Sequence, residues 1–397
     1  MRVDPFAPEA LEDPYELYAL LQREAPVHQI ASTGIWLVSR HADLVEAASK
    51  PDVFSSHISA IVYAGQGTNP AVLEGDPDAI GAVDVLATQD PPIHTAQRRL
   101  MNRTFVHARI AALEPWIRSF VGARLDEGVA RGSIEWMTEL AIPLPVNLIA
   151  GMLGMPSSDI PDLQRWSDAG VDLLSGVASL ERMAECWQEM VGFLAYLRTQ
   201  LLAPSPGSIT SEVGEAVARG DLDEREGTSM LLQLVVAGSE STTSLLGSAV
   251  RLLGSDAGVQ DGLRADLSRI PVFLEEALRL ESPFRGHFRV VTSDTVLGGV
   301  ALPKGARVML LWGAANRDVD AFSSPSSCDL GRAHPKGHVA FGSGIHFCLG
   351  APLARLEARV VLEELLARTR AVEVRGDVRH VPSLFVRRVE RLEIGLR

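Results

Sequence analysis

Apolar residues recur at helical spacing along most of the chain. Between residues 110 and about 201 they return every three or four positions, with breaks at glycines and prolines, which predicts several helices of ordinary length. Residues 223 to about 253 predict one long helix, roughly 45 Å at 1.5 Å per residue. Residues 349 to about 369 predict another helix, whose apolar stripes on opposite faces indicate burial on both sides.

Strand signals are short and scattered. Apolar runs at residues 27–30 and 36–39 predict a hairpin near the N-terminus. Further small sheets are expected at about 286–310 and 371–397. Residues 54–89 carry many glycines and prolines without a period, which predicts a long irregular loop. The pattern therefore predicts a mainly α-helical protein with small β-sheets.

Composition and charge narrow the class of protein. The chain has 397 residues, of which 46% are hydrophobic, enough for a large core. This length allows two or three domains, but no Gly/Ser or Pro linker divides it. The net charge of −13 gives little electrostatic support for binding nucleic acid. No apolar run reaches about 18 residues, and the cysteines are only three, so we expect a cytoplasmic protein that binds no membrane.

A lone cysteine stands in a glycine-rich loop that runs into a predicted helix. Cys348 follows Gly342 and Gly344 and precedes Gly350. A thiolate at a helix N-terminus is stabilised by the helix dipole and by free N–H groups, which lower its pKa. The three glycines allow left-handed backbone torsions and a close approach by a flat group. These properties suit a planar macrocycle with an axial cysteine ligand.

The middle of the long predicted helix has an unusual composition. Residues 237–243 read Ala-Gly-Ser-Glu-Ser-Thr-Thr, and a buried glutamate there is costly unless it is paired or functional. The Ser241 hydroxyl could bond the Ala237 carbonyl one turn back and open the helix slightly. The alternative is a hydroxyl-rich helix that packs tightly on a neighbour.

Two spacings suggest paired charges. His94 and Arg98 are four residues apart on one helical face and can grip one anion together, or form a solvated basic face. Glu276 and Arg279 are three residues apart, a spacing that most often gives a surface ion pair.

The loop at residues 341–350 resembles the signature of the cytochrome P450 family, Phe-Gly-x-Gly-x-His-x-Cys-x-Gly, at every fixed position. Segments 90–98, 237–242, 276–279 and 315–318 resemble other patterns of the soluble bacterial branch, in the same order. The resemblance covers essentially the whole chain. It implies a single large helical domain over residues 1–397 that binds haem b (heme b, iron protoporphyrin IX) through an axial Cys348.

The resemblance also implies roles for individual residues around the haem. The cationic side chains expected at the haem propionates are His94, Arg98, Arg289 and His346. The residues expected against the haem are Ala237, Gly238, Phe341, Gly342 and Gly350. The buried structural pair would be Glu276 and Arg279; the arginine that usually joins it is replaced by Ser327, so it is missing or comes from elsewhere, with Arg332 as the candidate.

In the family an acid and an alcohol deliver protons during oxygen activation. By resemblance Glu240 is the acid and Ser241 stands at the alcohol position, where threonine is usual. Ser241 serves with looser geometry, Thr242 substitutes for it, or the enzyme depends less on controlled proton delivery. The sequence leaves these three alternatives open.

The substrate pocket is the least defined part of the prediction. The candidates are Gln66, Leu86, Ala87, Phe284 and His287. His287 can equally be a core histidine with satisfied hydrogen bonds. Acidic side chains are few in this set, so a mostly apolar, medium-sized small-molecule substrate is expected.

The resemblance implies a monooxygenase that uses O2 and two external electrons, with hydroxylation as the default reaction. We expect a role in secondary metabolism; oxidative coupling of an aromatic cyclic dipeptide is an option that Gln66 supports weakly. No flavin or nicotinamide fingerprint occurs, so the electrons are expected from a ferredoxin and a ferredoxin reductase. Docking is expected near Arg99, Arg103, Lys336 and Arg355.

Two other classes of protein match part of the pattern. Zinc ligand types gather at Cys328, His334, His338, His346 and Cys348, but no Cys-x-x-Cys or His-Glu-x-x-His pattern occurs. A haem-binding sensor without catalysis would leave Glu240 and the hydroxyl run without a purpose.

Overall fold

The computed structural model describes residues 4–57, 60–65, 70–74 and 82–397. Its helices are α1 Pro8–Glu12, α2 Tyr15–Glu24, α3 His41–Ala48, α4 Ile93–Thr104, α5 His107–Ala111, α6 Glu114–Arg131, α7 Pro143–Leu153, α8 Ile160–Leu174, α9 Leu180–Leu202, α10 Ile209–Ala218, α11 Glu224–Ser255, α12 Ala257–Ala265, α13 Ile270–Leu280, α14 Trp312–Ala315 and α15 Ala351–Arg368. Its strands are β1 Val27–Gln29, β2 Trp36–Val38, β3 Phe54–Ser55, β4 Ala60–Ala64, β5 Pro70–Glu74, β6 Ser133–Glu135, β7 His287–Val291, β8 Thr295–Leu297, β9 Val300–Leu302, β10 Arg307–Leu310, β11 Val372–His380 and β12 Val389–Leu396.

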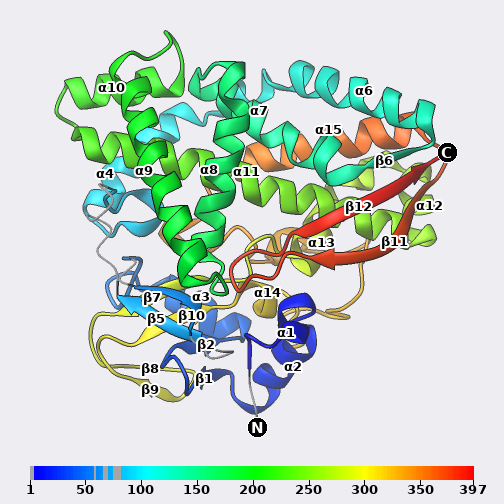
Figure 1. Ribbon diagram of the computed structural model, residues 1–397. Coiled ribbons are helices and arrows are strands. Elements are labelled where there is room, and N and C mark those ends of the chain that lie inside the picture. The colour runs from blue at the N-terminus through cyan, green and yellow to red at the C-terminus, as the bar shows by residue number, and fades with distance from the viewer. Residues whose placement is uncertain (1–3, 58–59, 66–69, 75–81) are drawn as a thin grey trace.

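The long helix α11 organises the helical part of the molecule. It runs between α7, α8, α9, α13 and α15 and contacts each of them (Figure 1). Its start is fixed by a capping box, in which the Asp223 carboxylate accepts from the Glu226 N–H at 2.7 Å and the Glu226 carboxylate accepts from the Asp223 N–H at 2.8 Å. The predicted long helix is thus confirmed to within two residues at its C-terminal end.

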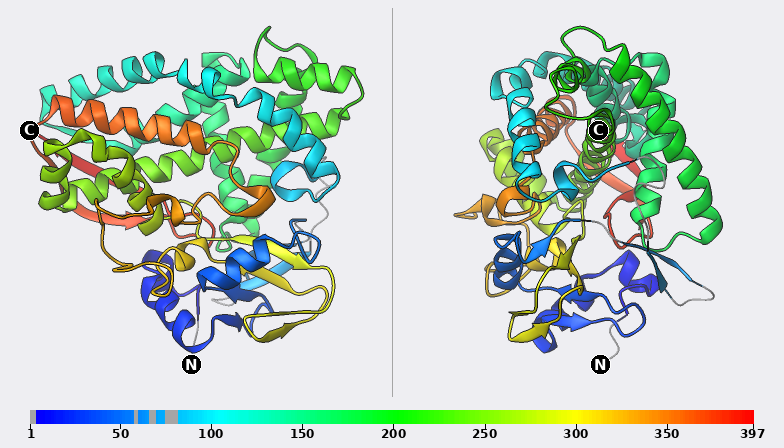
Figure 2. Two further views of the ribbon diagram at one scale, coloured as in Figure 1. Left: turned by 180° about the vertical axis from the view of Figure 1, so that it is seen from behind. Right: turned by 90° about the vertical axis from the view of Figure 1, so that its left-hand side faces the viewer.

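The sheets lie mainly at the other side of the molecule. The largest has the order β1-β2-β10-β7-β3 and packs with α1, α2 and α3 below the helical part (Figure 2). A second sheet, β11-β12-β6, joins the C-terminal hairpin to the helical part. The predicted small sheets account for β1, β2, β7, β10, β11 and β12, whereas β3 and β6 were not predicted. The irregular loop expected at residues 54–89 is partly wrong, because β4 and β5 pair there as an antiparallel hairpin.

Helix α15 is buried along both faces, as its two apolar stripes predicted. Leu353, Leu356 and Val360 on one face and Val361 and Leu365 on the other are all buried. They belong to one apolar core that also contains α6, α11 and α13. Ala351, which begins this helix, is therefore fixed by close packing, and so is the end of the cysteine loop that precedes it.

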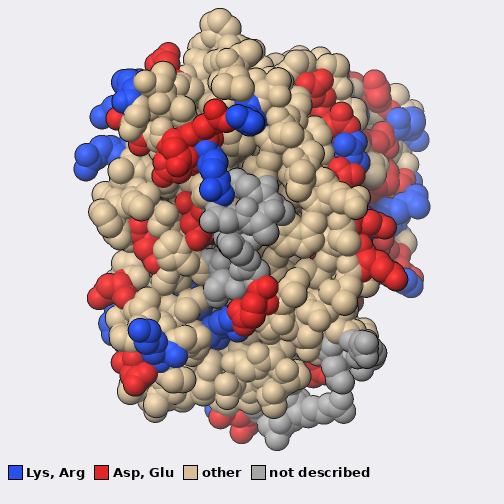
Figure 3. All heavy atoms as spheres, turned by 60° about the vertical axis from the view of Figure 1, so that its left-hand side comes forward, with Lys and Arg blue, Asp and Glu red and all other residues tan. Residues whose placement is uncertain are grey.

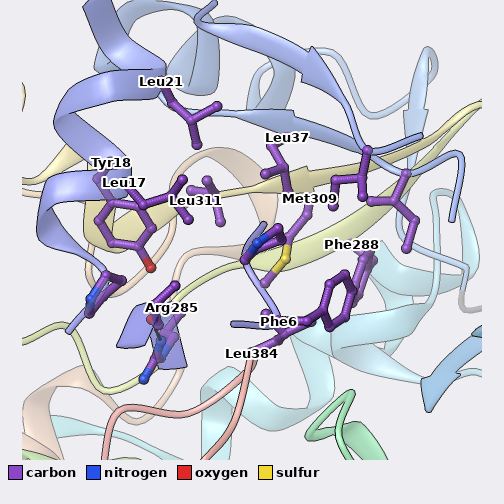
Figure 4. Close-up of a pocket in the computed structure, with 15 residues that line it drawn as sticks. Phe6, Leu17, Tyr18, Leu21, Leu37, Arg285, Phe288, Met309, Leu311 and Leu384 are labelled. Atoms are coloured by element: carbon purple, nitrogen blue, oxygen red, sulfur yellow. Dashed lines mark hydrogen bonds between the residues drawn. The ribbon is translucent and has the colours of Figure 1, made fainter. Parts of the chain in front are cut away.

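A small pocket lies outside this core, between α2 and the sheet (Figure 4). Leu17, Leu21, Met309 and Leu311 give it apolar walls, and it encloses about 460 Å³ including its open part. Arg285, the charged residue of its described lining, donates hydrogen bonds to the carbonyls of Ala10, Leu11 and Val386. The Arg285 side chain is therefore committed to holding the N-terminal segment.

The distribution of charge on the surface and the apolar character of the helices limit the kinds of partner that the protein can bind. The face in Figure 3 carries acidic and basic side chains intermixed, without one continuous basic surface. Within the described residues, no helix combines the length and the apolar character needed to cross a bilayer.

Candidate haem-thiolate site

A large cavity opens where α4, α11, β7, α15 and the cysteine loop meet. It encloses about 1450 Å³ of space between atoms, including the part open to solvent, and its lining is mostly apolar. The sequence-predicted residues that line it are Leu86, Ala87, His94, Arg98, Ala237, Gly238, Ser241, Thr242, Phe284, His287, Arg289, Phe341, Gly342, His346, Cys348 and Gly350. The fold thus brings together residues that are up to 264 positions apart in the sequence.

The cysteine loop is held by its backbone. The Cys348 N–H donates to the Phe341 carbonyl at 2.9 Å, which closes the loop. Gly342 and Gly344 have φ values of 74° and 69°, and a Cβ at Gly344 would collide with the Ala48 carbonyl. Gly350 has a φ of −82° and, as the N-cap residue, leads directly into α15, so the left-handed torsions that glycine allows are used at Gly342 and Gly344 and not at Gly350.

Cys348 lines the cavity just ahead of α15. Burial raises the pKa of its thiol, against the N–H groups of Gly350 and Ala351 and the charge of Arg98, which lower it. The predicted lowered pKa is therefore wrong for the free thiol, because loss of solvation outweighs stabilisation by the helix terminus. A metal cation on the sulfur would favour the thiolate.

Four cationic or imidazole side chains gather at one side of the cavity. His94 and His346 have ring centroids 4.3 Å apart, and Arg98 and Arg289 line the same cavity. Burial, with Arg289 and His94 nearby, lowers the pKa of His346 to about 3, and burial lowers the pKa of Arg289 to about 10. Burial is the main cause of both shifts, and the charge of Asp90 offsets it only in part.

This cluster fits the carboxylates of a haem. Both ring nitrogens of His94 are buried and lack a hydrogen-bond partner, although buried polar groups are normally paired. Arg98 donates one hydrogen bond to the neutral Phe347 carbonyl and Arg289 donates one to the neutral Phe288 carbonyl, at 2.7 Å each. Anionic propionates would satisfy these donors, and the adjacent apolar space with Cys348 suits a planar macrocycle.

On α11, Ser241 behaves as its sequence suggested. Its hydroxyl donates to the Ala237 carbonyl at 2.8 Å. Ser241 and Thr242 line the cavity, whereas Glu240 does not. Burial raises the pKa of Glu240 to about 7, despite the opposing charge of Arg388.

The sequence reasoning missed Arg388, which lies just before β12. Its Nη1 donates to Glu240 Oε2 at 2.8 Å and to Asp168 Oδ1 at 3.3 Å. The Asp168 side chain is 41% exposed and the Glu240 side chain 3% exposed. Arg388 therefore links a buried acid on α11 to a solvated acid on α8, and no sequence spacing signals a contact across 148 positions.

The predicted structural pair is buried and has a third member. Arg279 donates to the Glu276 carboxylate through Nε at 2.8 Å and Nη2 at 2.9 Å. Arg332 adds hydrogen bonds to the same carboxylate at 2.6 and 3.1 Å, so the candidate named from the sequence is the third member. Ser327 contributes its carbonyl, which accepts from Arg279 at 2.9 Å.

The predicted pocket residues divide into three groups. Leu86, Ala87, Phe284 and His287 line the cavity. His287 is also hydrogen-bonded, since its Nδ1 accepts from the Trp312 indole N–H at 2.6 Å, so both alternatives for it hold. Gln66 lies outside the described residues.

The lining residues that were not predicted include Gln233 and Glu357, whose side chains are polar. Glu357 is buried, its Oε2 has no hydrogen-bond partner, and burial raises its pKa well above the ordinary value. Glu357 lies nine residues after Cys348 on α15, and this proximity in the sequence could have indicated that it lines the cavity.

The zinc alternative gains no support. His338 is committed elsewhere, because its Nε2 lies 2.8 Å from the Glu275 carboxylate. Across the described ranges, no group of three His, Cys, Asp or Glu side chains is placed to hold a metal ion.

Arg355, one of the basic residues expected at the docking site, pairs with Glu275, at 2.6 and 2.9 Å. Its charge is therefore engaged within the protein.

Comparisons with known proteins agree with this geometry. The sequence model of the family described as "Cytochrome P450" matches residues 209–383. The chain is 38% identical over 395 residues to "Cytochrome P450 144" of Mycobacterium tuberculosis, covering 98% of this chain and 91% of that protein. It is 32% identical over 395 residues to "Cytochrome P450 109" of Bacillus spizizenii, covering 96% and 92%.

Solved structures give the same result. Cytochrome P450 CREJ in complex with (4-ethylphenyl) dihydrogen phosphate has a TM-score of 0.90 at 27% identity, covering 97% of each chain. CYP109E1 from Bacillus megaterium in complex with testosterone has a TM-score of 0.86 at 29% identity, covering 98% of this chain and 99% of that one.

Proposed function

The chain belongs to the cytochrome P450 family of haem-thiolate monooxygenases, and from this premise we propose that it hydroxylates a mostly apolar, medium-sized molecule of secondary metabolism. The observation that carries the proposal is the convergence of Cys348 and four cationic or imidazole side chains on one cavity beneath the Ser241 turn of α11. We also propose that residues 1–397 form one P450 domain.

We propose that Cys348 is the axial ligand and that His94, Arg98, Arg289 and His346 receive the haem propionates. Bound haem b with a thiolate ligand supplies O2 activation for inserting one oxygen atom into a C–H bond. The four side chains offer donors without an anionic partner in the cavity wall, which supports the assignment.

Proton delivery is assigned to α11 and its surface link. Glu240, with a pKa of about 7, can take up and release a proton near neutral pH. Arg388 holds it beside the solvated Asp168. The Ser241 proton points to the Ala237 carbonyl, which leaves the hydroxyl oxygen free to accept from a group in the cavity. We assign Ser241 as the alcohol, with Thr242 as the alternative.

The substrate proposal rests on the lining. Leu86, Ala87, Leu234 and Phe284 are apolar, and Glu357 is the one carboxylate among the described lining residues. The structural relatives bind an aryl phosphate and a steroid, so likeness does not select one substrate. Coupling of an aromatic cyclic dipeptide stays a prediction, because Gln66 lies outside the described residues.

Electrons are proposed to come from a ferredoxin and its reductase at the face of the cysteine loop. Phe347 and Ile345 are 44% and 38% exposed there, and Arg99, Arg103 and Lys336 are exposed basic residues. Charge reversal at these three should slow reduction and flatten its salt dependence. Unaltered reduction kinetics would refute this docking site.

The test of the proposed function uses protein from haem-replete cells. Reduction under carbon monoxide should give the Soret band of a thiolate-ligated haem, and Cys348→Ser should abolish it. Cys186→Ser is the matched control, because Cys186 is buried in α9 and absent from the cavity lining. Protein without haem, or a band typical of histidine ligation, contradicts the proposal. A panel screen for ligand-induced Soret shifts then identifies the substrate class.

A further inference from the structure

A short turn at residues 83–89, the Leu86 turn, forms part of the cavity wall ahead of α4. Leu86 and Ala87 both line the cavity. Leu86 has a φ of 43°, a left-handed torsion that is unfavourable for a residue with a side chain. Such a torsion persists only where surrounding contacts enforce it.

Gln233 of α11 grips this turn with both ends of its amide. Its Oε1 accepts from the Ala87 N–H at 3.2 Å, and its Nε2 donates to the Val85 carbonyl at 2.9 Å. The two bonds flank Leu86 on either side. They therefore fix the peptide groups that define its torsion.

Gln97 of α4 holds the same turn through the Leu86 N–H. Its Oε1 accepts from the Leu86 N–H at 2.8 Å, and its Nε2 donates to Glu226 Oε1 at 3.0 Å. Glu226 is in turn fixed by the capping box of α11. The Gln97 amide, which is 2% exposed, is thus oriented by one donor and one acceptor.

Two more contacts fasten the start of the turn. The Val83 N–H donates to the Ser229 hydroxyl of α11 at 3.1 Å, and the Asp84 carboxylate lies 2.7 Å from His57 Nδ1. A loop that was expected to be irregular is therefore bonded to α4 and α11 through consecutive backbone groups. Local opening would break several of these bonds together.

We propose that Gln97 and Gln233 are specificity-determining positioning residues, which clamp the Leu86 turn in the cavity wall and so set an upper limit to the size of the molecule that binds. This inference rests on the proposed function, because the cavity is taken to be the haem and substrate site. The clamp holds Leu86 and Ala87 inward, and a bulky ligand binds only if the turn is displaced.

Ligands of different size test the clamp in the haem-loaded protein. Imidazole and clotrimazole are titrated, with binding followed by the shift of the Soret band. Gln233→Leu and Gln97→Leu each remove hydrogen bonds to the turn. Gln260→Leu is the matched control, because Gln260 holds both the Val372 N–H and carbonyl at 2.9 and 3.0 Å in the same way, far from the cavity lining.

Each clamp variant should bind clotrimazole about tenfold more tightly than the wild type and imidazole within about twofold of it. Gln260→Leu should match the wild type for both. Amide hydrogen exchange should accelerate over residues 82–92 in the clamp variants only. The imidazole shift shows whether the haem site of a variant is intact. Unchanged or weakened clotrimazole binding in a clamp variant with an intact haem site overturns the inference. Wild-type protein without haem refutes the proposed function and this inference with it.

Discussion

Replacing Arg388 with leucine should move the titration of Glu240 to higher pH. Arg388 is the charged partner of this buried carboxylate, at 2.8 Å. A hydrogen bond to a charged group contributes about 1.5–3 kcal/mol, and one pKa unit corresponds to about 1.4 kcal/mol. The pKa of Glu240, about 7 in the intact protein, should therefore rise by about one to two units.

The sign for stability follows from proton linkage. Folding raises the pKa of Glu240 from its ordinary value of 4.5 to about 7, so the folded state binds more protons across this interval. The associated stability is present below pH 4.5 and is lost as the pH rises to about 7, a difference of about 3 kcal/mol. In Arg388→Leu the loss should continue to a pH about one to two units higher.

Infrared spectroscopy measures this pKa without a substrate. The carboxylic-acid C=O band of Glu240 is identified by subtracting the spectrum of Glu240→Gln, and its intensity is followed against pH in the wild type and in Arg388→Leu. Arg388→Lys is the control that keeps a positive charge and should shift the band less. A titration of Glu240 at the same or lower pH in Arg388→Leu would refute the assigned role of Arg388.

Three further outcomes are expected from the site. His94→Leu should speed haem transfer to apomyoglobin about tenfold, by loss of one hydrogen bond to a charged propionate, whereas Asn102→Leu on the exposed face of α4 should not. Ser241→Ala should release more hydrogen peroxide per electron pair with a substrate from the spectral panel; unchanged coupling would assign the alcohol role to Thr242. Arg332→Leu should lower the unfolding free energy by about 1.5–3 kcal/mol in denaturant titration, since it removes hydrogen bonds to the buried Glu276 carboxylate while Arg279 remains.

Residue spacing predicted local contacts, whereas the long-range contacts that were predicted, such as that of Arg332 with Glu276, came from the family resemblance. The cysteine loop closes through a bond between residues 341 and 348, and Ser241 bonds Ala237 one turn away, so spacing alone determines both. Arg388 reaches Glu240 from 148 positions away, and nothing in its own segment distinguishes it from neighbouring arginines. The β4–β5 hairpin was missed because its glycine- and proline-rich surroundings concealed two short apolar runs.

Partner number explains why one buried carboxylate titrates near neutrality. Burial would raise the pKa of Glu281, but the charges of Arg387, Arg251 and Arg317 outweigh it and hold the pKa below its ordinary value. Glu357, with Oε2 unpaired, has a pKa raised well above that value. Glu240 has one arginine, which partly offsets burial and leaves its pKa at about 7. A carboxylate that exchanges protons at neutral pH needs this intermediate balance between burial and a neighbouring positive charge. Among these three glutamates only Glu240 has that balance, and it is next to the cavity-lining Ser241 in the sequence.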